Sequence, residues 1–383
     1  MSRRQSPTRG LVLTATVLAL IAGACGSSAA SADQASALDQ ALRSFVHRGD
    51  GPPGIAVVIQ RDQAPVLHQA GTAIVGTRRP VRITDHLRLA SVAKAFSGAT
   101  ALALVAHGDL RLDTTIGSRL PGLPPLWAPI TLAQLLHHTS GIPDFSQSPA
   151  FQQAVGNSLL HPPAPRALLD FVATDPLEFT PGSRYAYSNT DNIIVGLMAE
   201  AASGHTYPQE LARLVFGPLR LANTSLPLDA AIPAPTVHGY AIAPPDPPDD
   251  VTNLFAAGWS WASGGIVSSP GDANRFVRAY VRGTLTNAAT RRAQRDFVAG
   301  GSEPPGPGRN RAGLALFEYR TRCGTAYGHT GNTPGYTAFI AANGSGTRST
   351  SVTINAQITP KSAPRAFRAL RSIFELAVCE ALH

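Results

Sequence analysis

The stretch Leu87-Arg88-Leu89-Ala90-Ser91-Val92-Ala93-Lys94 opens an apolar, alanine-rich run that continues to Ala106 and meets Gly108. A run of this kind predicts a buried helix that ends at the glycine. Ser91 then lies in the first helical turn, and Lys94 follows one turn later on the same face. A serine and a lysine so placed suit nucleophilic catalysis in which the amine activates the hydroxyl. The alternative is a surface lysine beside a capping serine, because the spacing S-x-x-K is common by itself.

Lysine is scarce in this sequence. Lys94 and Lys361 are the only lysines, so 30 of the 32 basic residues (32 minus 2) are arginine. Arginine cannot release its proton, whereas burial in an apolar environment lowers the pKa of a lysine and lets it accept a proton. The choice of lysine at position 94 therefore favours a proton-transfer role over a fixed structural charge.

A second polar segment, Tyr185-Ala186-Tyr187-Ser188-Asn189, follows the turn at Pro181-Gly182 and precedes a helical run. The phenol of Tyr187 and the carboxamide of Asn189 can face one cleft from a short loop. Tyr187 would then exchange a proton with the nucleophile, and Asn189 would hydrogen-bond a substrate amide. A structural turn is the alternative interpretation of this segment.

A third segment, Tyr327-Gly328-His329-Thr330-Gly331-Asn332, leads into a predicted strand that begins at Thr337. Small residues on an edge strand would let a substrate lie against free backbone donors. His329, taken alone, is more often a structural residue than a functional one.

Helical and strand periodicities occur at both ends of the chain. Helices are predicted over 34–46 and 364–381, and strands over 55–59, 66–74, 337–342 and 350–355. These elements predict an α/β protein of the α+β type, in which one antiparallel sheet is built from both chain ends and flanked by the terminal helices. We expect one domain over 33–383, with a sheet lobe of about 33–110 and 260–383 and an inserted, mainly helical lobe of about 111–259. Stretches rich in proline and glycine over 232–250 and 303–308 are predicted to be surface loops that need no binding role.

The first 32 residues have the pattern of an export signal. Three arginines precede an apolar run over 11–22, which is too short for a comfortable membrane span. Cys25 follows Ala22-Gly23-Ala24 as in a bacterial lipobox and would be lipidated there, whereas Ala30-Ser31-Ala32 is an ordinary cleavage site. We expect a secreted protein, with a membrane-anchored lipoprotein as the alternative.

The basic character of the chain is modest. The formal charge of +8 falls to +5 once the three arginines of the export signal are removed, because 29 basic and 24 acidic residues remain. No cluster of five or more basic residues occurs, so we expect no nucleic-acid partner. A mild attraction to an anionic cell wall is the most that this charge predicts.

Beyond the export signal, Cys323 and Cys379 are the remaining cysteines. In an oxidising compartment such a pair predicts a disulfide, to which the chain-entropy model assigns roughly 4 kcal/mol. Two buried free thiols are the alternative.

The three polar segments occur in the order S-x-x-K, Y-x-N, H-T-G. This order resembles that of the penicillin-recognising serine hydrolases, which include the serine-type D-alanyl-D-alanine carboxypeptidases and the class C β-lactamases. The likeness covers roughly residues 35 to 380 and implies a β-lactamase/transpeptidase-like fold. It also runs through Leu135-Leu136-His137-His138-Thr139-Ser140-Gly141-Ile142, Phe179-Thr180-Pro181-Gly182 and Trp259-Ser260-Trp261-Ala262-Ser263-Gly264-Gly265.

The resemblance implies a role for each matching residue. Ser91 would be acylated, while Lys94 and Tyr187 would transfer its proton. The backbone N–H groups of Ser91 and Asn332 would form the oxyanion hole, an interaction worth roughly 3 to 4 kcal/mol per donor. Asn189 would orient the scissile amide, and His329 and Thr330 would line the carboxylate side of the substrate. The other implied substrate-binding residues are Gly331 and Trp261.

The resemblance implies no cofactor. His137 and His138 belong to a structural signature of the family, and no Cys/His ligand set accompanies them, so we expect no metal site. The implied activity is that of a monomeric D-alanyl-D-alanine carboxypeptidase that forms an acyl-enzyme with peptides of the cell-wall peptidoglycan or with β-lactams. A β-lactamase or an esterase on the same scaffold, or a slow-turnover penicillin-binding protein, is the alternative.

Two positions depart from the carboxypeptidase pattern. The arginine that receives the terminal carboxylate in that branch is replaced by Phe317, with Arg320 and Arg322 nearby, and a glutamine beyond H-T-G is replaced by Thr333 or Pro334. These departures bear on which substrate is bound rather than on the serine chemistry.

Overall fold

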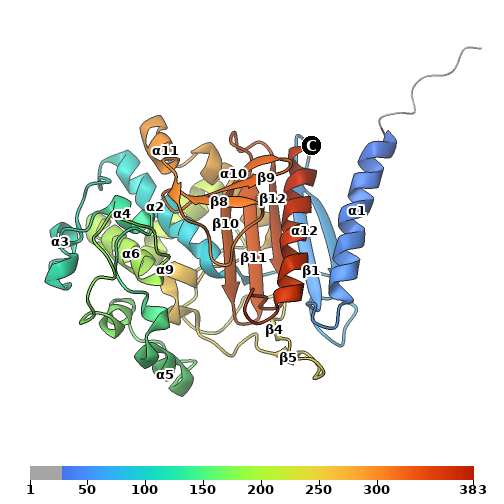
Figure 1. Ribbon diagram of the computed structural model, residues 1–383, viewed down its shortest axis with the longest axis horizontal. Coiled ribbons are helices and arrows are strands. Elements are labelled where there is room, and N and C mark those ends of the chain that lie inside the picture. The colour runs from blue at the N-terminus through green and yellow to red at the C-terminus, as the bar shows by residue number, and fades with distance from the viewer. Residues whose placement is uncertain (1–27) are drawn as a thin grey trace, which may run out of the picture.

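An eight-stranded antiparallel sheet is the centre of the fold (Figure 1). The computed structural model describes residues 28–383, and its sheet has the strand order β2-β1-β12-β11-β10-β9-β8-β7. The N-terminal β1 pairs with the C-terminal β12, with Ile55 opposite Ile354. The predicted sheet built from both chain ends is therefore confirmed. Its strands are β1 (Gly54–Gln60), β2 (Val66–Gly71), β7 (Val298–Ala299), β8 (Arg309–Ala312), β9 (Phe317–Thr321), β10 (Gly324–Thr333), β11 (Tyr336–Ala342) and β12 (Ser349–Ile354).

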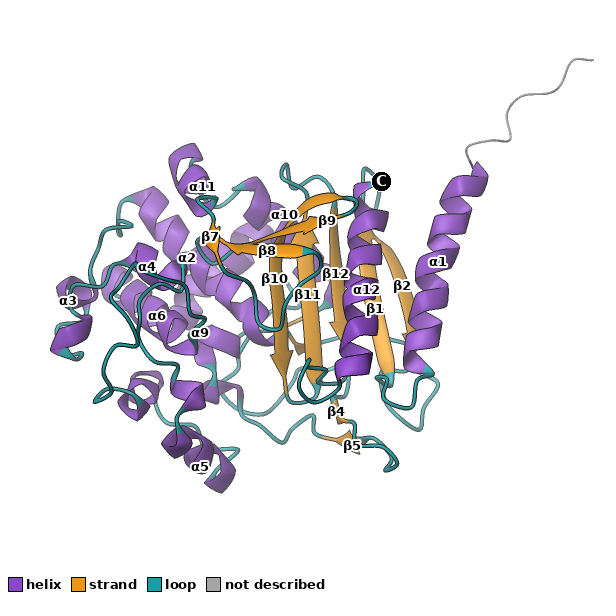
Figure 2. Ribbon diagram, in the orientation of Figure 1, coloured by secondary structure: helices purple, strands orange, loops and turns teal. Residues whose placement is uncertain are grey.

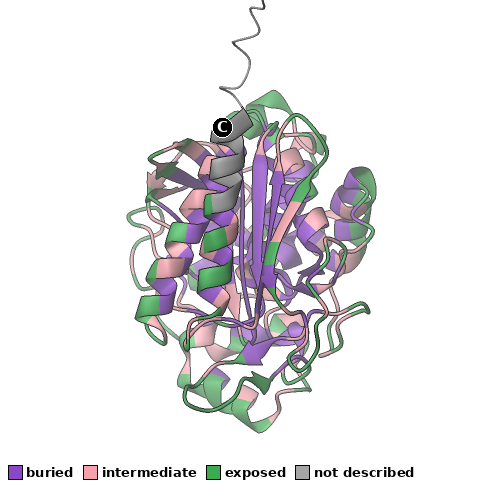
Figure 3. Ribbon diagram, turned by 90° about the vertical axis from the view of Figure 1, so that its right-hand side faces the viewer, coloured by how far each residue is buried: buried purple, intermediate pink, exposed green. Residues whose placement is uncertain are grey.

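Helices cover both faces of this sheet (Figure 2). The terminal helices α1 (Ser28–Val46) and α12 (Pro364–Leu382) lie on one face, and α10 (Pro270–Arg282) packs on the other. Successive residues of a strand point to opposite faces, so Phe339 packs against α12 while Ile340 joins the core around α10. Strand β11 is consequently buried along its whole length, as the central strands of Figure 3 show.

Strand β2 is shorter than predicted. The sequence favoured a strand over 66–74, but β2 ends at Gly71, which has φ +74°. A Cβ at this position would lie 2.0 Å from the carbonyl oxygen of Pro53. The left-handed backbone and the close approach both require glycine, and the left-handed residue ends the extended conformation.

A disulfide joins Cys323, between β9 and β10, to Cys379 on α12. The two Cα atoms are 5.1 Å apart, and the cysteines are separated by 56 positions in the sequence. A loop of this length corresponds to about 4 kcal/mol in the chain-entropy model. The bond fastens the last helix to the sheet that it covers.

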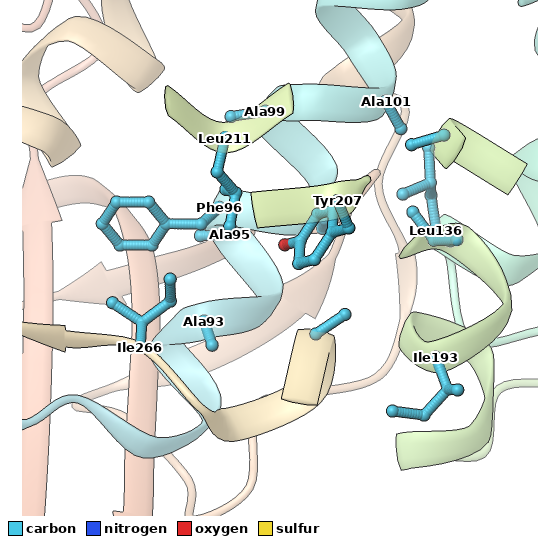
Figure 4. Packing of buried hydrophobic residues seen from close by; sticks show 14 of the residues in the cluster. Ala93, Ala95, Phe96, Ala99, Ala101, Leu136, Ile193, Tyr207, Leu211 and Ile266 are labelled. Carbon is cyan, nitrogen blue, oxygen red and sulfur yellow. The ribbon is translucent and has the colours of Figure 1, made fainter. Parts of the chain in front are cut away.

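The helical part of the molecule is organised around α2 (Ala93–His107). All residues from 93 to 104 are buried, and Figure 4 shows Phe96 of this helix in a cluster with Tyr207 and Leu211. Residues 90–107 have the length and hydropathy of a membrane span, yet most of them lie inside the protein. As predicted, the helix ends at Gly108, which has φ +89°.

Eight further α-helices and two small sheets complete the described part of the fold. The helices are α3 (Ile116–Arg119), α4 (Leu132–Leu136), α5 (Pro149–Asn157), α6 (Asn189–Ser203), α7 (Tyr207–Leu211), α8 (Gly217–Leu219), α9 (Trp261–Gly264) and α11 (Ala288–Gln294). The small sheets pair β3 (Leu87–Arg88) with β6 (Val267–Ser268), and β4 (Tyr240–Ala241) with β5 (Asp249–Asp250). The pairing of β3 with β6 brings the start of α2 next to the segment that leads into α10.

The predicted export signal, with Cys25 and the two processing sites at 22–25 and 30–32, is not tested by the structure. Cys25 lies outside the described residues. Lipidation and export therefore stay predictions.

Candidate active site

Ser91 lies in a 3-10 turn, Ala90–Val92, that leads directly into α2. Ala90 before it has φ +50°, a left-handed conformation that costs an alanine roughly 1–2 kcal/mol. The turn places Ser91 at the wall of a cavity of about 950 Å³, while its neighbours Ala90 and Val92 are buried. The side chain of Ser91 is therefore presented to the cavity by a rigid and locally strained segment.

Lys94 is fully buried and lies beside Ser91. Its Nζ is 3.2 Å from Ser91 Oγ, 2.6 Å from Asn189 Oδ1 and 2.8 Å from the carbonyl oxygen of Ser263. Burial lowers the pKa of Lys94 to about 7, although the nearby carboxylate of Asp144 opposes the shift. Near neutral pH the amine is therefore divided between its neutral and charged forms, and the neutral form can accept the Ser91 proton.

Tyr187 faces the same serine from the segment before α6. Its ring centroid is 4.9 Å from Lys94 Nζ, and its hydroxyl is buried without a hydrogen bond of good geometry. Burial raises the pKa of Tyr187 well above its usual value, and only the proximity of Ser91 works against this. The phenol therefore stays protonated at neutral pH, which suits a proton donor better than a base.

Asn189 begins α6 and is held on both sides of its carboxamide. The oxygen accepts a hydrogen bond from Lys94, and Nδ2 donates to Asp144 Oδ2 at 2.8 Å and to Ser146 Oγ at 3.0 Å. The amide lines the cavity, but its donors are already used. A substrate amide would have to replace one of these partners to receive the predicted hydrogen bond.

Strand β10 brings Gly331 against the nucleophile. A Cβ on Gly331 would lie 2.2 Å from the Leu89 carbonyl oxygen and 3.1 Å from the Ser91 backbone nitrogen, so only glycine fits here. Asn332 follows and lines the cavity, where its Nδ2 donates to Thr337 Oγ1 and to the carbonyl oxygen of Ile358. The two backbone positions predicted for the oxyanion hole thus lie on adjacent segments.

The edge-strand expectation for this segment is met only in part. Strand β10 lies inside the sheet between β9 and β11, but its pairing with β9 stops at Gly328. Beyond that residue β10 pairs with β11 alone. The H-T-G end of β10 is therefore an edge on one side, because β9 pairs only with the first half of the strand.

His329 and Thr330 turn their side chains into the protein. Both residues are fully buried, and the His329 ring packs edge-on against Phe317 at 4.9 Å. Burial lowers the pKa of His329 to about 3, so the imidazole is neutral. Thr330 Oγ1 donates to the carbonyl oxygen of Pro304 at 2.6 Å. Neither side chain lines the cavity, so the substrate contacts predicted for them find no support in this arrangement.

Trp261 is also a core residue. Its side chain is 2% exposed, and its ring lies 5.0 Å from that of Tyr207. A Cβ on Gly196 of α6 would lie 2.7 Å from the indole, so the ring fills the space between α6 and α9. The predicted substrate contact at Trp261 is absent from the cavity lining. The segment that contains Trp261 contributes to the site through the carbonyl oxygen of Ser263, which accepts a hydrogen bond from Lys94 Nζ.

Sequence reasoning missed several residues of the cavity. The lining includes Tyr185, Glu303, Lys361 and Arg371. Glu303 belongs to the proline- and glycine-rich stretch that was expected to be a surface loop without a binding role. The available sequence signal for a binding role was a lone acidic residue followed by two prolines in such a loop. No local sequence pattern placed it in the cavity that contains Ser91.

The chain is similar to several curated proteins. A D-aminopeptidase of Cereibacter sphaeroides is 29% identical over 206 residues, which are 53% of this chain and 39% of that protein. The D-alanyl-D-alanine-carboxypeptidase/endopeptidase AmpH of Escherichia coli is 26% identical over 246 residues, 61% of this chain and 58% of that protein. The chain thus spans about two fifths of the length of that D-aminopeptidase.

Solved structures share the architecture. A D-stereospecific amidohydrolase from Streptomyces sp. matches with TM-score 0.76 and 27% identity, over 88% of this chain and 98% of that one. A D-amino acid amidase from Ochrobactrum anthropi matches with TM-score 0.78 and 24% identity, over 90% and 98% of the two chains. This second likeness shows the fold alone.

A family model described as Beta-lactamase matches residues 38–374, which is most of the chain. The matched region contains the helix that carries Ser91 and Lys94, the Tyr187 segment and strand β10. The relatives named above are hydrolases by name. The protein therefore belongs to the Beta-lactamase family and is a serine hydrolase of that fold.

Proposed function

We propose that this enzyme hydrolyses an amide bond beside a D-configured amino-acid residue, through an acyl-enzyme formed at Ser91. The observation that carries the proposal is the buried Lys94, whose Nζ lies 3.2 Å from Ser91 Oγ and whose pKa is lowered to about 7. A neutral amine at this distance can take the hydroxyl proton as the oxygen attacks.

The two half-reactions follow from these positions. Ser91 Oγ bonds to the carbonyl carbon of the substrate while its proton passes to Lys94 Nζ. The bond from that carbon to nitrogen then breaks, and the leaving nitrogen takes a proton from Tyr187 or, through it, from Lys94. Water next attacks the ester carbon and gives a proton to the same groups. The bond from that carbon to Ser91 Oγ then breaks, the acid leaves, and Oγ takes the proton back to restore the Ser91 hydroxyl.

The backbone N–H groups of Ser91 and Asn332 are proposed to hold the developing oxyanion. Support comes from Gly331, which lets β10 approach the Ser91 turn more closely than any other residue would allow. Two such donors would contribute roughly 3 to 4 kcal/mol each to the stability of the transition state.

The first candidate substrate is a cell-wall peptide that ends in D-alanyl-D-alanine. Relatives with carboxypeptidase names, among them AmpH, support it. The cavity offers the exposed Lys361 as a cation for a terminal carboxylate. The reaction would then release the C-terminal D-alanine from peptidoglycan peptides.

The second candidate is a D-aminoacyl amide or peptide with a free amino group. A specific observation favours it: the cation that would receive a carboxylate is missing at two places beside β10. Phe317 is buried and apolar, and His329 is buried and neutral. Relatives named D-aminopeptidase and a neighbour named D-stereospecific amidohydrolase support this candidate.

One experiment tests the proposal. Steady-state turnover of a D-alanyl-D-alanine peptide, a D-amino-acid amide, a cephalosporin and a short-chain ester is measured side by side. We expect one of the two D-configured amides to give the highest kcat/KM, and its L-enantiomer to react at least ~10-fold more slowly. Intact mass must show an adduct on the wild type and none on Ser91→Ala. Turnover that survives in Ser91→Ala, or no preference for a D-amide, would contradict the proposal.

A further inference from the structure

The loop between β7 and β8, residues 300–308, forms one wall of the cavity beside Ser91. Hydrogen bonds fix it to the residues around it. Tyr185 donates its hydroxyl hydrogen to the carbonyl oxygen of Gly301, Tyr319 donates to Ser302 Oγ at 3.1 Å, and Thr330 Oγ1 donates to the carbonyl oxygen of Pro304. This wall is therefore an ordered part of the site.

The loop presents the carboxylate of Glu303 to the cavity. Among residues 37–383, whose side chains the structure describes, none forms a salt bridge or a hydrogen bond with this carboxylate. Partial burial raises the pKa of Glu303, the nearby Asp144 adds to the rise, and the cation of Lys94 opposes it. An acid without a side-chain partner, on the wall of the cavity that contains the nucleophile, attracts a cationic group of a bound substrate.

The same position disfavours a carboxylate. The resemblance places the carboxylate side of a substrate along the H-T-G strand, yet the Thr330 hydroxyl is taken by Pro304, the residue next to Glu303. Arg371 also reaches this wall, but its guanidinium donates to the carbonyl oxygens of Gly306 and Gly308. A carboxylate at this place would meet the Glu303 charge instead of a free cation.

We propose that Glu303 binds a protonated primary amine of the substrate close to the scissile bond, and so selects amides and peptides that carry a free amino group. The inference rests on the proposed hydrolysis at Ser91, because it names the substrate class of that site. The amine can be the α-amino group of a D-aminoacyl unit or the side-chain amine of the residue before a D-alanine. Both sources present the same ammonium to the same carboxylate.

A binding experiment tests this without turnover. Ser91→Ala and Ser91→Ala/Glu303→Gln are titrated by calorimetry with D-phenylalaninamide and with Nα-acetyl-L-lysyl-D-alanyl-D-alanine, each compared with its fully N-acetylated form. The first pair carries the α-amine, and the second carries the side-chain amine. Glu375→Gln on α12 is the matched control, because it makes the same substitution outside the cavity.

We expect at least one free amine to bind Ser91→Ala about 10- to 100-fold more tightly than its acetylated form, as a charge-assisted hydrogen bond predicts. The preference should vanish with Glu303→Gln and persist with Glu375→Gln. Glu303→Lys should shift affinity toward the fully acetylated peptide, which keeps its terminal carboxylate. The pair that shows the effect identifies the source of the amine.

Two results would overturn the inference. The first is that Ser91→Ala binds the free amines and their acetylated forms with equal affinity, or binds neither form. The second is that the preference for the free amine persists in Ser91→Ala/Glu303→Gln. The proposed function fails separately, if the enzyme with Ser91 intact turns over none of these amides. Glu303-dependent binding of an amine by Ser91→Ala would still be seen in that case, so the two failures are distinguishable.

Discussion

Replacing Lys94 by arginine tests whether the amine moves a proton or only supplies charge. Lys94 Nζ contacts Ser91, Asn189 and Ser263, and burial lowers its pKa to about 7. An arginine keeps the positive charge, but its guanidinium has a pKa above ~12 and stays protonated. If Lys94 is the base, Lys94→Arg should therefore damage acylation as severely as Lys94→Ala.

The size of the loss follows from the general-base role. Such groups contribute about 100- to 10,000-fold, and we expect both variants to lose acylation rate by that order. The wild type should also show the titration directly. With a pKa near 7, roughly a tenth of the amine is neutral at pH 6 and roughly nine tenths at pH 8, so the acylation rate should rise about tenfold between these values.

The assay is the pre-steady-state burst of acylation by a chromogenic acyl donor, recorded from pH 5.5 to 9. Because Lys94 is fully buried, the larger guanidinium can also disturb packing, and the thermal unfolding midpoint of each variant is the control. A Lys94→Arg protein that folds normally and acylates within a few-fold of wild type would refute the reasoning. Lys94 would then be an electrostatic anchor only, and the proton-transfer role would pass to Tyr187.

Three further outcomes are expected. Gly331→Ala should lower kcat/KM by about 100-fold and the stability by about 1–3 kcal/mol, because its Cβ would press on the Leu89 carbonyl, whereas the control Gly344→Ala meets nothing closer than 3.6 Å and should change little. The free energy of unfolding of the wild type relative to Lys94→Met should rise between about pH 7 and pH 10, by at most ~1.4 kcal/mol per pH unit. The reason is that the unfolded chain keeps the Lys94 proton up to about its usual pKa of 10.5, whereas the folded protein keeps it only to about 7. Denaturant unfolding at pH 7, 8 and 9 measures this difference, and a difference that does not change with pH would contradict the lowered pKa. If Cys25 is lipidated, cell fractionation should find the protein in membranes and Cys25→Ser in the medium; wild type found wholly in the medium would remove the lipoprotein hypothesis.

The terminal elements were accessible from sequence because their signals are local. The helix that carries Ser91 and Lys94 follows from an apolar run ended by glycine, and a spacing of three residues places both side chains on one helical face whatever surrounds them. Sheet strands at both chain ends followed from β-branched runs bounded by turns. Two boundaries differ by more than one residue: α1 begins at Ser28 rather than at residue 34, and β2 ends early at Gly71, whose left-handed conformation accompanies the close approach of Pro53.

The environment of the site was decided by tertiary structure alone. Whether His329 is a charged substrate contact or a neutral core residue depends on its burial against Phe317. Trp261 fills a gap between two helices that no local pattern defines. Glu303 and Ser91 line one cavity although more than 200 positions separate them in the sequence. A pKa is set by desolvation and by neighbouring charges. Both depend on which distant segments meet, so the sequence alone determined the reacting groups, and the fold determined their protonation and the charge that a substrate encounters.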